Sequence, residues 1–279
     1  MATRASAPAS AFGALLRSWR QRRRLSQLAL ALDADISQRH LSFVESGRAQ
    51  PSRELVLLLA DHLDVPLRDR NKLLLAAGYA PVFNERPLDN PAMDVVRGAV
   101  ERVLQGHEPF PAIAVDRHWT LVASNSAIAR WLVGVSPALL QPPVNVLRLS
   151  LHPEGLAPRI ANLAQWRAHL LERLRRQVEV SADPVLEELL AELRGYAAPA
   201  REGSASVVRA IEPADNGVFI PLQFATDQGI MSFISTTTVF GTPVDVTVSE
   251  LALECFFPAD AFTADYLKSG VTAESVASR

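Results

Sequence analysis

The 279-residue chain lacks most features of disulfide-bonded, membrane-spanning or secreted proteins. Its single cysteine, Cys255, excludes a disulfide within the chain and favours a reducing compartment, so a cytoplasmic protein is expected. Because Cys255 lies in the apolar run LALECFFP, we expect a buried, inert thiol. No apolar run approaches the roughly 20 residues that a membrane helix needs. The first residues, MATRASAPASAF, have no long apolar segment and are interpreted as a flexible tail, not a signal peptide.

Catalytic signatures are missing as well. Neither G-x-G-x-x-G nor G-x-x-x-x-G-K occurs, and the G-x-S-x-G turn of serine hydrolases is absent. The histidines of the larger part of the chain, His107, His118, His152 and His169, do not have the spacing of metal ligands. The sequence therefore predicts no enzyme, no cofactor and no metal site.

Charge of one sign is not in excess overall, but it is unevenly distributed. The chain has a formal net charge of −2; residues 1–81 carry 12 Lys and Arg against 7 Asp and Glu, and the remainder carries 16 against 23. A basic first part on an acidic remainder is what phosphate contact by one domain requires. The arginines from Arg20 to Arg24 leave two interpretations open, a phosphate-facing one and a merely solvated one.

Residues Ser26 to Gly47, SQLALALDADISQRHLSFVESG, predict two short helices around a tight turn. The residues expected to face inward are Leu30, Ala31, Ile36, Leu41 and Val44. This assignment leaves an exposed face on the second helix, made of Ser37, Gln38, Arg39, Ser42 and Phe43. Gln and Arg have forked ends that match adenine and guanine edges in the major groove, so the segment is interpreted as a DNA reader.

Three more helices are predicted around this pair. An apolar helical period runs from Phe12 to Trp19, Ser52 is a predicted N-cap, and a fifth helix is expected from Leu67 to Ala77, ending at Gly78. With LSQ…ISQRHLSFVESGRAQPS…LADHLDVP, residues 9–81 resemble the XRE-type, phage-repressor-like family of helix-turn-helix domains. The turn departs from the family, which usually has Gly where this chain has Asp35, a residue that tolerates a left-handed backbone.

The resemblance implies a role for each matching position. Base edges of a double-stranded DNA operator would be read by Ser37, Gln38, Arg39 and Ser42, and DNA phosphates would be contacted by Gln27, Ser46, Arg48 and Arg53. Phe43 replaces the usual polar residue; it either packs on a thymine methyl group or shields the helix. One motif reads only a few base pairs, so we expect a homodimer on two half-sites about 34 Å apart.

A proline-rich stretch, PVFNERPLDNP, predicts a linker at residues 82–91 before an α+β domain at residues 92–270. In that domain we expect a helix from Ala92 to Leu104, two strands within PAIAVDRHWTLVASN, and a helix at 125–132. A helical middle should follow at 156–178 and 184–196. Antiparallel strands are predicted in SVVRAIEP, GVFIPLQFAT, GIMSFISTTTVFG and PVDVTVSELALECFFP, with a last helix from Ala259 to Lys268.

The segment D-x-x-W-x-L-V-x-x-N-x-A-x-A-x-W, from Asp116 to Trp131, and the order of elements resemble a PAS-like sensor. Together with the first domain, the chain resembles the MmyB-like subgroup of XRE regulators. The resemblance implies two domains, an all-α five-helix domain and a PAS-like α+β domain with an antiparallel sheet. It also implies a transcription factor gated by a small apolar ligand, with a fatty acid as a candidate.

The candidate pocket residues are Trp119, Leu121, Trp131, Trp166, Phe219, Phe224 and Phe233. Such side chains between a sheet and helices suit an apolar cavity, although the same residues would also make an ordinary core. Asn125 is predicted to cap a helix, and Arg159 and Arg167 are candidates to meet a carboxylate at the cavity mouth. The alternative hypothesis is that the second domain serves only dimerisation or protein contact, and activation and repression are both open.

Overall fold

The structure is a computed structural model that describes residues 11–197 and 219–277. These residues form two compact units. The first contains the chain up to Pro87 together with Thr242–Ser249, and the second contains Leu88–Gly241 and the chain from Glu250 onward.

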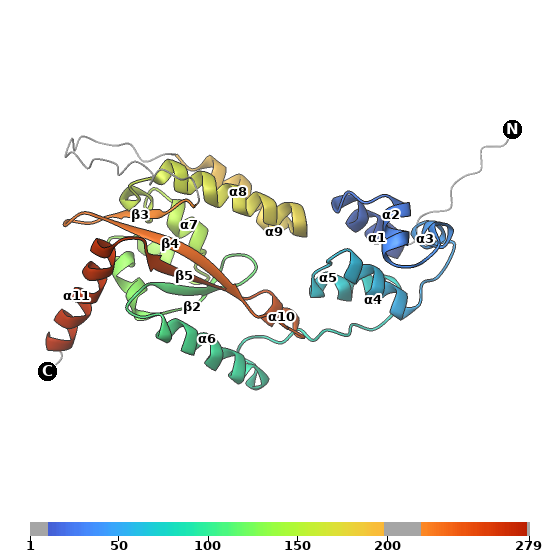
Figure 1. The fold of residues 1–279 in the computed structure, drawn as a ribbon, viewed down its shortest axis with the longest axis horizontal. Helices are drawn as coiled ribbons and strands as arrows, with labels where there is room; N and C mark the ends of the chain where they lie inside the picture. The colour runs from blue at the N-terminus through green and yellow to red at the C-terminus, as the bar shows by residue number, and fades with distance from the viewer. Residues whose placement is uncertain (1–10, 198–218, 278–279) are drawn as a thin grey trace. The chain divides into compact units, whose positions relative to one another are not determined.

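Five helices make up most of the first unit (Figure 1), as predicted. They are α1 (Ala11–Arg22), α2 (Gln27–Asp33), α3 (Gln38–Glu45), α4 (Arg53–His62) and α5 (Leu67–Ala76). Ser26, Ser37 and Ser52 are N-caps whose hydroxyl oxygens accept a hydrogen bond from the backbone N–H three residues later, at 3.0, 3.1 and 3.2 Å. The turn between α2 and α3 contains Asp35 with φ of 51°, the left-handed conformation that the sequence predicts.

Helix α3 is held against α1 by close backbone packing. A Cβ atom on Gly13 of α1 would lie 2.3 Å from the carbonyl oxygen of Glu45, so only glycine fits at this crossing. Phe12, Leu16 and Leu41 are buried in the core of the unit. The position and tilt of α3 therefore depend on a contact between two backbones.

The eight-residue segment Thr242–Ser249 belongs to the first unit, although in sequence it lies between two strands of the second unit. It carries the short helix α10 (Val246–Ser249), and the Val246 N–H donates to the Asn84 carbonyl at 2.7 Å. The strand predicted over 243–258 is wrong in its first half. Asp245 accepts a hydrogen bond from the Thr247 N–H at 3.0 Å, and this local cap starts a helical turn within the Val- and Thr-rich run.

The second unit is α+β, as predicted (Figure 1). Its strands are β1 (Ala112–Val115), β2 (Leu121–Ser124), β3 (Leu222–Ala225), β4 (Ile230–Val239) and β5 (Ala252–Pro258). They form one antiparallel sheet in the order β2-β1-β5-β4-β3. The α-helices are α6 (Asp94–Gly106), α7 (Val146–Leu151), α8 (Leu163–Ser181), α9 (Pro184–Gly195) and α11 (Ala261–Ala277). Short 3₁₀ helices are η1 (Pro91–Met93), η2 (Ser126–Leu132), η3 (Pro137–Leu140) and η4 (Ala157–Arg159).

Both faces of the sheet are covered, which explains why every residue of β1 is buried. Ile113 and Val115 face the main core with the aromatic residues, whereas Ala112 and Ala114 pack with α6 on the opposite face. Figure 1 shows α8 and α9 running together on the side of the sheet away from α6. Cys255 is a free, buried thiol on the α6 face, and burial raises its pKa, as suits an inert side chain.

Two further sequence expectations change. The predicted helix from 156 begins as the short helix η4 and continues as α8 only from Leu163. Asn125 is not a side-chain cap: its amide accepts from the Ala112 N–H and donates to the carbonyls of Leu104 and Phe110, so it joins β1, α6 and the loop between them. The strand predicted in SVVRAIEP lies outside the described residues.

Candidate nucleic-acid interface and apolar cavity

The solvent-facing side of α3 carries the residues predicted to read bases. Ser37 caps the helix with its hydroxyl, Gln38 and Arg39 are exposed in its first turn, and Ser42 and Phe43 are half-buried. The guanidinium groups of Arg39 and Arg48 lie 5.3 and 5.8 Å from the centre of the Phe43 ring. The Phe43 ring thus packs against the guanidinium groups of both arginines, a role that the sequence analysis did not predict.

The residues predicted to contact phosphates divide into two groups. Arg48 and Arg53 are exposed after α3 and at the start of α4, where their charges are accessible. Ser46 is the C-cap of α3 and donates to the Phe43 carbonyl at 3.2 Å. The Gln27 amide donates to the Glu45 carboxylate at 2.7 Å, an internal contact between residues 18 apart that single-sequence reasoning missed.

The basic run before α2 is only partly a surface feature, which corrects both interpretations for Arg20 and Arg23 and leaves them open for the exposed Arg22 and Arg24. Arg20 is 8% exposed and makes a bidentate pair with Glu45, at 2.6 and 2.9 Å. Arg23 donates to the carbonyls of Leu63 and Asp64 at the end of α4, at 2.7 and 2.8 Å. Two of these arginines therefore stabilise the fold.

The second unit contains a cavity of about 290 Å³ between the sheet and helices α7 and α8. Eighteen of its 22 lining residues are apolar; the other four are Ser150, Arg173, Ser235 and Glu254. Five of the predicted pocket residues line it, namely Trp119, Leu121, Trp131, Trp166 and Phe224. Phe219 is 48% exposed, and Phe233 is fully buried behind the Trp131 ring; neither is among the lining residues.

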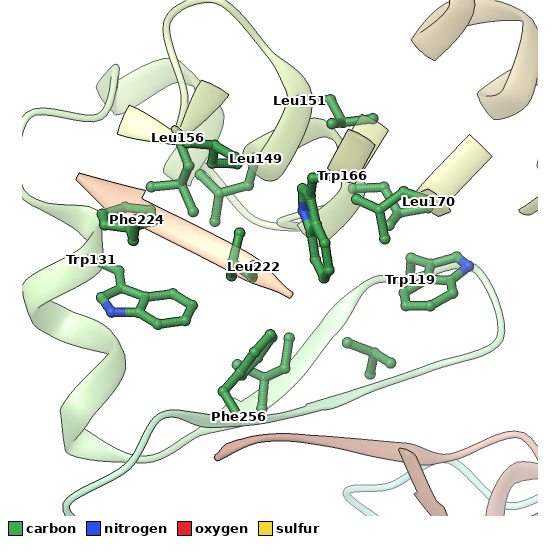
Figure 2. Close-up of a cluster of buried hydrophobic side chains, with 14 of the residues drawn as sticks. Trp119, Trp131, Leu149, Leu151, Leu156, Trp166, Leu170, Leu222, Phe224 and Phe256 are labelled. Atoms are coloured by element: carbon green, nitrogen blue, oxygen red, sulfur yellow. The ribbon is translucent and has the colours of Figure 1, made fainter. Parts of the chain in front are cut away.

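Each indole is positioned by a different element (Figure 2). Trp131 of η2 stacks on Phe224 of β3, with ring centres 5.3 Å apart, and meets Phe256 of β5 edge-on at 5.1 Å. The Trp166 indole N–H donates to the Ser150 hydroxyl at 3.1 Å, and the Trp119 indole N–H donates to the Gln177 side chain at 2.9 Å. These contacts hold aromatic rings around the cavity with their polar atoms directed to protein partners.

The charged groups in the cavity wall satisfy one another. Arg173 of α8 binds both carboxylate oxygens of Glu254 on β5, at 2.5 and 3.1 Å, and its guanidinium lies 4.6 Å from the Trp119 ring centre. Thr237 donates to the same carboxylate at 2.9 Å. The sequence analysis did not predict a role for Glu254, although a lone acid within the apolar run LALECFFP is the signal of a buried ion pair. The cavity wall therefore presents little unpaired charge to a bound ligand.

The two arginines predicted to meet a carboxylate at the cavity mouth do not line this cavity. Arg167 donates to the carbonyls of Leu193, Arg194 and Tyr196, and so stabilises the end of α9. Arg159 lies beside Trp131 and lines a different pocket.

Within residues 11–197 and 219–277, no cluster of three or more His, Cys, Asp or Glu side chains could hold a metal ion. No helix in the described part of the chain is long and apolar enough to cross a membrane.

Family models match both units. The model described as the MmyB-like transcription regulator ligand binding domain matches residues 96–269, and the model of a helix-turn-helix domain matches residues 11–73. Neither description is that of an enzyme. A search among curated proteins gave no significant match.

Proposed function

The chain belongs to the MmyB-like transcription regulators, and from this premise we propose that it binds a specific DNA operator through α3 and responds to an apolar ligand held in the cavity of its second unit. The observation that carries the proposal is a 290 Å³ cavity with an almost wholly apolar wall in a chain that also presents an exposed Gln-Arg pair at the start of a helix-turn-helix recognition helix.

The DNA-binding part of the proposal rests on Gln38 and Arg39. A recognition helix docks in the major groove with its N-terminal residues against base edges, which is where these two exposed side chains lie. Phe43 limits the freedom of the Arg39 guanidinium by packing against it, so less conformational entropy is lost when Arg39 binds guanine. Arg48 and Arg53 then supply sequence-independent phosphate contacts.

Arg39→Ala should weaken binding to the operator by about 1–3 kcal/mol and binding to random DNA by less, because a base contact is lost. Arg53→Ala is the matched control. Because Arg53 would contact a phosphate, this variant should weaken both complexes equally, and the slope of log affinity against log salt concentration should fall by about the contribution of one phosphate. Both affinities are measured at one fixed salt concentration. An equal loss on both DNAs for Arg39→Ala would make Arg39 a phosphate contact.

The ligand part of the proposal rests on the size and chemistry of the cavity. Its wall presents mostly hydrocarbon and aromatic surface, and contact of such surface with water is unfavourable. A bound apolar molecule would remove this contact with water. A long acyl chain, as in a fatty acid, fits a cavity that offers hydrocarbon and aromatic surfaces with its one ion pair already satisfied.

Native mass spectrometry and organic extraction of the purified full chain test for a bound ligand, and acyl chains are then titrated against tryptophan fluorescence. Val144→Phe narrows the cavity and should weaken binding, whereas Val133→Phe, at a position that is 71% exposed, should not. If no apolar molecule binds, the second unit is left with the role of dimerisation or protein contact. If both variants bind the ligand like the wild type, the ligand is not held in this cavity.

We further propose that the regulator acts as a homodimer on a roughly palindromic operator. One recognition helix reads only a few base pairs, and two-fold symmetry places two such helices about 34 Å apart. Sedimentation of the full chain at micromolar concentration, with and without operator DNA, measures the oligomeric state; a monomer bound singly to the operator would contradict this part.

A further inference from the structure

Trp131 lines two pockets. Besides the apolar cavity it lines a second pocket of about 250 Å³, formed by η2, η4, the turn between β3 and β4, and α11. Arg130, Arg159 and Tyr266 contribute to this pocket. No aspartate or glutamate is found among its lining residues in the described part of the chain. Its composition therefore differs sharply from that of the apolar cavity.

The indole N–H of Trp131 is an unused donor. Trp131 is 5% exposed, and its Nε1 has no hydrogen-bond partner among the residues that the structure describes, unlike the Nε1 atoms of Trp119 and Trp166. Figure 2 shows this nitrogen on the edge of the ring that faces away from Trp166 and Trp119. A buried donor is normally satisfied, so this one indicates an acceptor that lies outside the described residues.

Arg159 places a positive charge in the wall of the same pocket. Its Nη1 donates to the carbonyls of Trp131 and Val133, at 2.9 and 3.0 Å, and its guanidinium lies 4.4 Å from the centre of the Phe224 ring. Within the described ranges, its Nε and Nη2 have no hydrogen-bond partner and no carboxylate pairs with it. Burial lowers the pKa of Arg159, which is the sign of a cation that is held in place but not neutralised.

The two arginines of the second unit that touch pocket tryptophans thus differ in what they leave available. Both Nη atoms of Arg173 donate to Glu254. Among the described residues, Arg159 instead has N–H groups without a partner, beside a pocket that is lined by no acidic residue. A planar guanidinium and an N–H donor in one pocket wall are groups that recognise carboxylate and phosphate oxygens.

We propose that this second pocket, named here the anion pocket, binds a carboxylate or phosphate group through Arg159 and the indole N–H of Trp131. The group has two sources: the head of an amphipathic ligand whose chain fills the apolar cavity, or a separate small anion. The first source rests on the proposed function, and the second does not.

The test uses the full chain with ¹⁵N-labelled indoles, which give four N–H signals for the four tryptophans. Trp131→Phe keeps an aromatic ring and identifies the Trp131 signal by its loss. Acetate and inorganic phosphate should shift this signal saturably. Arg159→Gln should weaken that binding about 10-fold or more, because a charge-assisted hydrogen bond is lost. Arg176→Gln, on a side chain that is 63% exposed and outside the anion pocket, should leave it unchanged.

Dodecanoate and dodecanol distinguish the two sources, because they share a chain and differ in the head. If the head group occupies the anion pocket, dodecanoate binds more tightly than dodecanol and Arg159→Gln removes the difference. If the anion is separate, the two bind alike and phosphate still binds in their presence. If phosphate binds but neither dodecanoate nor dodecanol does, the apolar-ligand proposal is overturned and the anion pocket is not. The anion pocket is overturned if no anion shifts the Trp131 signal saturably, or if Arg159→Gln binds every anion like the wild type.

Discussion

Glu45 ends the recognition helix with a fully buried carboxylate. Burial by itself raises its pKa. The hydrogen bonds from Arg20 and Gln27 and the charges of Arg20 and Arg17 together lower the pKa by more than burial raises it, so the net pKa lies below 4.5. The ionised form is therefore favoured by folding. Its stabilisation is complete above pH 4.5 and is lost as the pH falls through the lower pKa of the folded state.

Glu45→Gln should lower the free energy of unfolding of the first unit by about 3 kcal/mol at neutral pH, since it leaves Arg20 buried without its partner. Hydrogen exchange of the α1 and α3 amides measures this unit separately from the other. The difference between variant and wild type should shrink below pH 4.5. Asp33→Asn, at an exposed position at the end of α2, is the control and should change little; a pH-independent difference at Glu45 would contradict the assignment of the charge.

At the level of elements, the contact between α1 and α3 has no room for a side chain at Gly13. Alanine is the better helix former by about 1 kcal/mol, so local propensity alone favours Gly13→Ala. The carbonyl oxygen 2.3 Å from the added Cβ is backbone and cannot rotate away, which means that α1 and α3 must move apart. Packing should override propensity here.

Gly13→Ala should therefore destabilise the first unit, by roughly 1–3 kcal/mol, and weaken operator binding because α3 is displaced. Gly98→Ala is the matched control within α6: its Cβ would come no nearer than 3.8 Å to the flexible end of Arg102, so this variant should be neutral or stabilising. Thermal unfolding and operator affinity are measured on both. A Gly13→Ala protein as stable as the wild type would show that the helices can separate without cost.

Sequence predicted those elements whose signals are local. Ser26, Ser37 and Ser52 each cap a helix with an N–H three residues away, and such a spacing is visible in the sequence. Run 243–258 was misassigned because its alternating Val and Thr residues resemble a strand, while the cap at Asp245 decides the backbone. The partners of Gln27, Asn125 and Arg159 lie 13 to 28 residues away and depend on the fold, so residue type alone did not predict their roles.

For the whole molecule, the proposed operator site and ligand site must influence each other equally. If ligand changes operator affinity by some factor, operator must change ligand affinity by the same factor, because both describe one thermodynamic cycle. The sequence and the fold leave the sign open, so the bound ligand either strengthens or weakens operator binding.

Tryptophan-fluorescence titration of dodecanoate should give affinities that differ about 5- to 150-fold with and without operator DNA, the range of typical coupling energies of 1–3 kcal/mol. Operator titrations with and without dodecanoate should give the same factor. Random DNA is the control and should produce a smaller shift. Equal ligand affinities in all three conditions would mean that the two sites act independently.

The membership of Thr242–Ser249 in the first unit limits how such a regulator can be recombined. A gene fusion that joins a foreign DNA-binding domain at residue 87 would replace Asn84 and Arg86, whose partners Val246 and Asp245 are encoded some 160 codons downstream. The Arg86–Asp245 pair, at 3.3 Å, would be lost in the hybrid, and the Val246 N–H would need a carbonyl of the foreign domain as its acceptor. A working exchange of DNA-binding domains therefore has to carry two separate stretches of sequence, and inheritance should keep these stretches together.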